Sequence, residues 1–158
     1  MAIGGVDARQ VAALDAIVER LGRTVQRLGE LMRLVREAAV GDSPERLLDA
    51  VSLVEAAAAQ VSRLEDERLQ VQLALEQALG VRGLAAVVTR CRPTDAGACL
   101  DTHVAEMQLQ VAMLQDEEAR TAALLTSAIE IAQRMSGYVA RLRGVDTPYR
   151  PRAVGLVS

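Results

Sequence analysis

The sequence predicts an all-α protein, built as an antiparallel helical hairpin plus a long third helix in a coiled-coil-like bundle. Two observations indicate this fold. Residues that favour helices dominate the composition, with only four prolines in 158 residues. Apolar residues also recur at alternating spacings of three and four along three long segments, and no useful stretch alternates as a strand would. Because hydrophobic residues make up 51% of the chain and aromatic residues only 1%, the core has to be aliphatic. We expect one helical domain over residues 1–144.

The first helix is expected over about residues 7–40. Its apolar seam has mostly valine at one heptad position and leucine at the other. The seam consists of Val11, Leu14, Val18, Leu21, Val25, Leu28, Met32, Val35 and Ala39. Gly22 and Gly29 lie seven residues apart on one line of this helix, and we expect a second backbone to approach closely there.

The second helix is expected over residues 44–79. Ser43 suits the N-cap and Pro44 the first helical position. Because the connection to the first helix is so short, the two helices should form an antiparallel hairpin. Gly80 and Gly83 should end the second helix. Its seam consists of Leu47, Ala50, Val54, Ala57, Val61, Leu64, Arg68, Val71, Leu75 and Ala78.

A short helical turn over residues 84–90 should precede the third helix, expected over residues 95–143. Thr94 or Asp95 is suited to cap it, and Gly144 to end it. Residues 145–158 contain two prolines and are expected to form an extended or disordered tail. The third seam consists of Leu100, Val104, Met107, Val111, Leu114, Glu118, Thr121, Leu125, Ala128, Ala132, Met135, Val139 and Leu142.

Three polar residues interrupt these seams: Arg68, Glu118 and Thr121. The opposite charges of Arg68 and Glu118 would either form a buried pair that fixes helix register or reach water at the edge of the bundle. The choice depends on the path of residues 80–97, which the seam pattern does not define.

The composition argues against an enzyme and against a cofactor. The chain has one histidine and no glycine-rich phosphate loop, which excludes most familiar catalytic constellations. Cys91, Cys99 and His103 are the only grouping that invites a metal, and they lack a well-placed fourth ligand. The simpler interpretation is two small buried thiols and a histidine near a helix start.

Charge and hydropathy narrow the partners and the location. The net charge is −3, and the basic residues, all arginine, alternate with acidic ones, so no basic stripe is available for nucleic acid. No segment approaches about 18 uncharged apolar residues, so we expect no membrane insertion. The start of the chain does not resemble an export signal, and both cysteines should be reduced, which indicates the cytoplasm.

The C-terminal quarter has the composition of a protein-binding surface. Both tyrosines, Tyr138 and Tyr149, lie there among methionine and arginine residues, the types enriched at interfaces. The alternative is that Tyr138 only closes the end of the bundle and that the tail has no role. The predicted contacts to a partner helix are Leu125, Ile129, Met135, Tyr138, Val139, Leu142 and Tyr149.

Over residues 8–153 the order of these features resembles the FlgN-type flagellar export chaperones. The likeness rests on the hairpin with its Gly41-Asp42 turn, on LEDERLQVQLALEQALG at 64–80, on LQDEEARTAALLTSAIEIAQRMSGYVARL at 114–142 and on TPYRPRA at 147–153. Arg68 falls where that family tends to have an arginine. Glu118 and Thr121 stand where it commonly has two asparagines, and Arg150 where it usually has an acidic residue.

The resemblance implies a cytoplasmic, non-enzymatic chaperone. Such proteins bind hook–filament junction (hook-associated) proteins through the C-terminal helix and deliver them to the flagellar type III export apparatus, whose components are further expected partners. The alternative is a structural coiled-coil homo-oligomer, such as a homodimer, or a generic helical interaction module.

Overall fold

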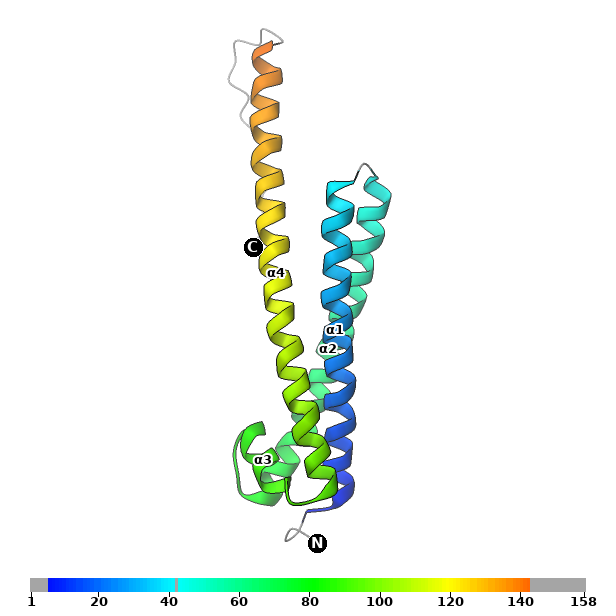
Figure 1. Ribbon diagram of the computed structural model, residues 1–158, viewed down its shortest axis with the longest axis vertical. Helices are drawn as coiled ribbons and strands as arrows, with labels where there is room; N and C mark the ends of the chain where they lie inside the picture. Colours follow the sequence, from blue (N-terminus) through cyan, green and yellow to red (C-terminus); the bar gives the residue numbers. More distant parts are fainter. Residues whose placement is uncertain (1–5, 42, 143–158) are drawn as a thin grey trace. The chain divides into compact units, whose positions relative to one another are not determined.

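The computed structural model describes residues 6–41 and 43–142, and these form four helices (Figure 1). The helices are α1 (Ala8–Val40), α2 (Pro44–Leu79), α3 (Leu84–Cys91) and α4 (Asp95–Leu142). No strand occurs among these residues, so the predicted all-α fold is confirmed. Gly144 and the predicted tail at 145–158 lie outside the described residues.

The chain divides into two compact units, Met1–Thr121 and Ala122–Ser158. The first unit holds α1, α2, α3 and the beginning of α4, whereas the described part of the second unit is the remainder of α4. The domain expected over residues 1–144 therefore extends across both units.

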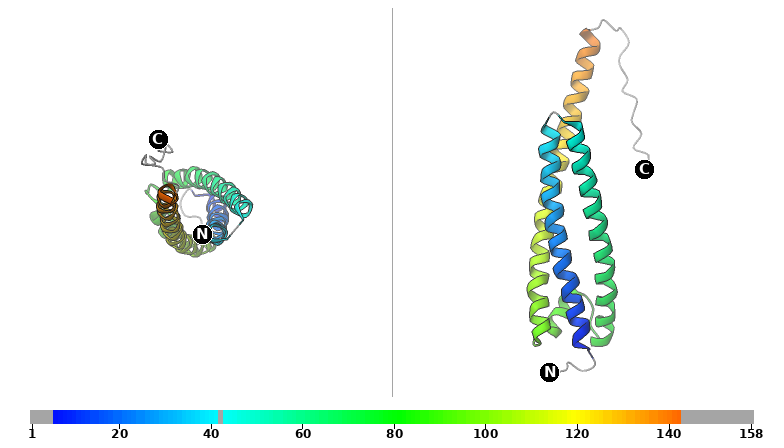
Figure 2. Two further views of the ribbon diagram at one scale, coloured as in Figure 1. Left: turned by 90° about the horizontal axis from the view of Figure 1, so that it is seen from above. Right: turned by 90° about the vertical axis from the view of Figure 1, so that its right-hand side faces the viewer.

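The hairpin of α1 and α2 forms as the sequence predicts, with the two helices side by side (Figures 1 and 2). Ser43 is the N-cap of α2, since its side chain accepts a hydrogen bond from the backbone N–H of Arg46, and Pro44 is the first helical residue. Asp7 caps α1 by accepting from the backbone N–H of Arg9. At its other end α2 stops at Gly80, whose φ of 66° is left-handed and suits glycine.

The core of the first unit is mostly aliphatic and comes mainly from the predicted seams, to which α3 adds Val87, Val88 and Cys91. Seven of the nine α1 seam positions are buried, and the five from Val11 to Val25 form one cluster with the first three seam residues of α4. The largest fully enclosed side chains are Leu14, Leu64, Leu75, Leu100, Val18, Val87 and Cys91. None of these enclosed side chains is aromatic, so the core depends on close packing of small and aliphatic side chains.

A tight turn leads from α3 into α4. The Thr94 hydroxyl donates to the carbonyl of Cys91 at 2.7 Å and accepts from the backbone N–H of Gly97 at 3.0 Å, so Thr94 is the residue that caps α4. A methyl group at Gly97 would overlap the carbonyl group of Cys91. Only glycine therefore fits this position without a shift of the backbone.

Within the first unit, the start of α4 runs parallel to α1. At Gly22 the expected close approach is found, because the Cα of Met107 lies 3.5 Å from the point where a Cβ would stand. At Gly29 the expectation is wrong: no atom lies within 4 Å of that point. The space beside Gly29 is instead a small cavity of about 80 Å³, lined in part by Gln110, Met113 and Leu114.

Among the described residues, no helix taken singly has the length and apolarity to cross a membrane. The pair α2 and α3, bent by 60° at the break between them, meets those requirements by length and composition alone.

Candidate functional site

Five of the predicted partner-binding residues lie on the part of α4 in the second unit with exposed side chains: Leu125, Ile129, Met135, Val139 and Leu142. Exposure runs from 40% at Val139 to 69% at Leu142. Ile131, which lies outside the predicted set, is as exposed as Ile129, at 59%. We call this surface the apolar arc; it consists of half-buried Leu124 and the exposed side chains of Leu125, Ile129, Ile131, Met135, Val139 and Leu142.

The two tyrosines cannot be assigned to this surface. Tyr138 belongs to α4, but its side chain is not part of the described structure. Tyr149 lies outside the described residues. The arc is therefore defined by its aliphatic side chains.

The arc continues a seam that is buried earlier in the same helix. Leu100, Val104 and Met107 are enclosed in the core of the first unit. From Val111 the seam becomes partly exposed, and from Leu125 its apolar members are exposed. One heptad pattern thus serves as internal core in the first unit and as accessible surface in the second.

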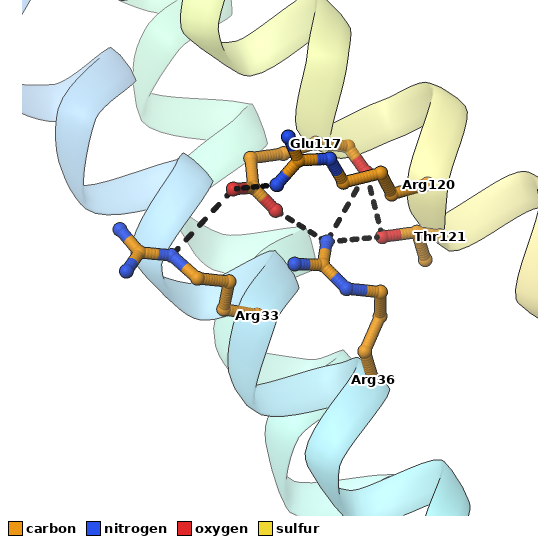
Figure 3. A network of polar contacts seen from close by, with 5 residues as sticks. All are labelled: Arg33, Arg36, Glu117, Arg120 and Thr121. Carbon is orange, nitrogen blue, oxygen red and sulfur yellow. Dashed lines mark hydrogen bonds and ion pairs between the residues drawn. The ribbon is translucent and has the colours of Figure 1, made fainter.

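A polar network marks the last turn of α4 within the first unit (Figure 3). The Arg36 guanidinium of α1 forms an ion pair with Glu117 Oε2, and it also donates to the Glu117 carbonyl at 3.3 Å and to Thr121 Oγ1 at 3.2 Å. Arg33 and Arg120 approach the other oxygen of Glu117, at 3.6 and 3.9 Å. The network joins α1 to α4 immediately before the second unit begins.

The charges of this network explain the acidity of Glu117. Its side chain is only 14% exposed, and hydrogen bonding to Arg36 lowers its pKa below the ordinary value, helped by the positive charges of Arg36, Arg120 and Arg33. Thr121, the seam break noted in the sequence, has a structural explanation here, because its hydroxyl accepts from Arg36 and donates to the Glu117 carbonyl at 2.8 Å.

Arg68, the other basic seam break, is satisfied within its own helix. It forms an ion pair with Glu65, which lowers the pKa of that carboxyl group, and it donates to buried Gln72. Gln72 in turn donates to Glu76 at 2.9 Å, and Glu76 accepts from the backbone N–H of Gly83 at 2.6 Å. Among the described residues no ion pair joins Arg68 to Glu118, which is exposed. Near this level of α4 the ionic contacts from α1 are those of Arg33 and Arg36 with Glu117.

The residues considered as metal ligands lie in different environments. Cys91 is buried, which raises the pKa of its thiol, whereas Cys99 is exposed. His103 Nδ1 lies 2.6 Å from Asp15 Oδ1 of α1, and this hydrogen bond raises the pKa of the imidazole. Asp101 pairs with Arg92 at 3.1 Å. In residues 6–41 and 43–142, no three His, Cys, Asp or Glu side chains are placed to hold a metal ion.

In the comparisons with known proteins, no family model matches this chain, and no curated protein or solved structure matches it either.

Proposed function

We propose that this protein is a cytoplasmic export chaperone of the FlgN type. In this proposal it binds hook-associated flagellar proteins on the apolar arc of α4 and delivers them to the type III export apparatus. The observation that carries the proposal is the arc itself, a surface of exposed aliphatic side chains on one helix at core-like spacing. The resemblance in the order of the sequence motifs adds the class of client.

The chemistry of the arc suits this task. A client helix destined to pack into a filament exposes an apolar stripe before assembly, and such a stripe promotes aggregation. Another amphipathic helix can cover that stripe without consuming ATP. Because the arc side chains are already partly covered in the free protein, each should contribute about 1 kcal/mol on binding, which leaves the complex reversible.

The direct test is binding of the purified hook-associated proteins encoded in the same genome, measured by isothermal titration calorimetry. Deleting residues 136–158 removes Val139 and Leu142 of the arc together with both tyrosines, so it should weaken binding at least about tenfold while circular dichroism shows the remaining chain still helical. Leu109→Gln tests whether loss of an exposed apolar side chain outside the arc also weakens binding, because Leu109 lies on α4 in the first unit and is 60% exposed. Unchanged binding after the deletion would refute the assignment of the site.

The rival interpretation uses the same surface for self-association. A structural coiled-coil homo-oligomer would also expose apolar seam residues in a single chain. Light scattering on the purified protein distinguishes the chaperone from the homo-oligomer. A stable oligomer that does not bind hook-associated proteins would contradict the chaperone proposal.

A further inference from the structure

We infer that part of α4 is a releasable strap, which leaves the hairpin of α1 and α2 while the beginning of α4 stays packed. The strap runs from Gln110 to Thr121, and all of it belongs to the first unit. The inference goes beyond the proposed function and does not depend on it. Its basis is a change along α4 in the contacts that hold this helix against α1.

The beginning of α4 is held by apolar packing. Leu100, Val104 and Met107 are buried and belong to the main core cluster. The backbones of α1 and α4 also come close here, because Met107 Cα lies 3.5 Å from the point where a Cβ of Gly22 would stand. Moving this part of α4 away from α1 would therefore expose several enclosed apolar side chains to water.

The strap has no such packing. Among the described residues of α4, none after Met107 is buried. The half-buried residues of the strap are Gln110, Leu114, Glu117 and Thr121, and three of these four are polar. The strap therefore meets α1 through a mostly polar row of side chains.

A cavity of about 80 Å³ also lies between α1 and the strap. Gly29 and Glu30 line it from α1, and Gln110 and Leu114 line it from the strap. Atoms that face a cavity lack neighbours on that side and lose the attraction that close packing would provide. The contact between the two helices is correspondingly weaker at this level.

The strap contacts a small second core, which we call the hairpin cluster. It consists of Leu28 and Leu31 of α1 and Ala57 of α2, all of them buried. Among the described residues of α4, Leu114 is the one side chain that packs against this cluster. Because a single half-buried leucine makes this contact, little apolar surface has to be exposed when the strap leaves.

The contacts of Glu117 hold the strap against α1 (Figure 3). Arg36 forms an ion pair with the Glu117 carboxylate, and it donates to the carbonyl of the same residue and to the Thr121 hydroxyl. Arg33, about one turn earlier on α1, lies 3.6 Å from the other carboxylate oxygen. Contacts of this kind require a defined distance and direction, so they are lost together once the strap moves away.

The strap should therefore open by itself. Its opening breaks the contacts of one carboxylate and exposes the hairpin cluster to water. Separation at the beginning of α4 would instead open the main core. Openings of such different extent occur independently in native proteins, and the smaller one is the more frequent.

The test measures access to the hairpin cluster in the full-length protein. Cys99→Ser removes the exposed native thiol, and Ala57→Cys adds a thiol to the cluster with a small change in volume. A small thiol reagent modifies position 57 when the strap is open, and mass spectrometry of peptides distinguishes this site from buried Cys91. Because local opening exposes little surface, the rate at position 57 should stay nearly constant as urea is raised towards the unfolding transition.

Two variants remove the contacts that hold the strap. Glu117→Gln removes the charge that pairs with Arg36, and Arg36→Gln removes the partner on α1. Each should speed the modification of position 57 about tenfold. The matched control is Glu118→Gln, the same substitution at the next residue, which is exposed and should change the rate less than about twofold. Circular dichroism of each variant checks that the helices still form.

Three outcomes would overturn the inference. A rate at position 57 that rises steeply at low urea would show that the cluster is exposed only when the whole bundle unfolds. An unchanged rate in either Glu117→Gln or Arg36→Gln would show that their contact does not hold the strap. An equal effect of Glu118→Gln would show a general response to charge on α4. Hook-associated proteins are absent from this assay, so their own titration decides the proposed function independently.

Discussion

Gly97 and Gly29 show how differently two helical glycines are constrained in the first unit. Gly97 stands against the carbonyl group of Cys91 in the turn that begins α4, where no side chain fits. Gly29 faces the small cavity between α1 and α4, and no atom lies within 4 Å of the position that a methyl group would take there. The same residue type is therefore required at one site and costly at the other.

Substituting alanine at these two glycines should change stability in opposite directions. Gly97→Ala forces the turn to move and should lower the free energy of unfolding by about 1–3 kcal/mol. Gly29→Ala adds helix propensity without a clash and should raise it by up to about 1 kcal/mol. Urea denaturation measures both, and a neutral Gly97→Ala variant would contradict the tight turn.

The pair of His103 and Asp15 should make stability fall at alkaline pH. Because hydrogen bonding to Asp15 raises the pKa of His103 above its usual 6.5, the charged pair stabilises the fold fully below that value and is lost as pH rises through the folded-state pKa. The difference in unfolding free energy between the wild type and His103→Gln should therefore be largest below pH 6.5 and shrink as pH rises through the folded-state pKa. His103 is the only histidine, so its NMR titration can be assigned directly.

At the scale of whole helices, α1 and α4 are joined by contacts of two kinds. Seam side chains pack in the core, and polar groups bond along the flank, with His103 near the start of α4 and Glu117 a few turns later. The polar contacts fix the register of the two helices, because each one has a specific partner.

Removing the ion pair between Arg36 and Glu117 should lower the stability of the protein at neutral pH but not at acidic pH. Arg36 lowers the pKa of Glu117, so the pair contributes stability above the ordinary pKa of 4.5 and loses it as pH falls through the lower folded-state value. Arg36→Gln should unfold at lower urea concentration than the wild type at neutral pH. The two midpoints should converge as pH falls below 4.5 and through the lower folded-state pKa of Glu117. Arg33→Gln, whose parent side chain is 55% exposed, serves as the milder control.

The helices themselves were predictable because their signals are local. The heptad of α1, the cap at Ser43 and the stop at Gly80 each depend on neighbouring residues, and the structure has all three. The apolar character of the arc was likewise visible in the sequence, although the strict seam pattern omits Leu124, Ile129 and Ile131, which lie beside it.

The contacts between helices were not predictable, because they depend on register. The segment from Gly80 to Gly97, which includes α3, determines which residues of α4 contact α1. The spacing of apolar residues does not predict the path of this segment. For this reason the sequence left open whether Arg68 meets Glu118 or both reach water, whereas the structure joins Arg36 to Glu117, one position from the seam. The role of Asp15 beside His103 was hidden for the same reason.

On the scale of the molecule, the buried residues of the described chain all fall between Val11 and Met107. A protein that ends at Thr121 keeps this whole core and the polar network of Arg36. It should therefore unfold at a urea concentration close to that of the full chain, as followed by circular dichroism. A second truncation after Asp101 removes Val104 and Met107 from the core and should unfold far more easily; equal midpoints for the two truncations would contradict the placement of the core.

Because one cysteine is exposed and the other is buried, their rates of reaction with a thiol reagent should differ. Cys99 should react with a thiol reagent immediately, whereas fully enclosed Cys91 should react only when the turn between α3 and α4 opens. The slow second step of such a titration would report the opening rate of this corner of the bundle without any introduced label. The rate at which this turn opens in the native protein can thus be measured from the two cysteines alone. Two equally fast reactions would show that the turn between α3 and α4 is already open.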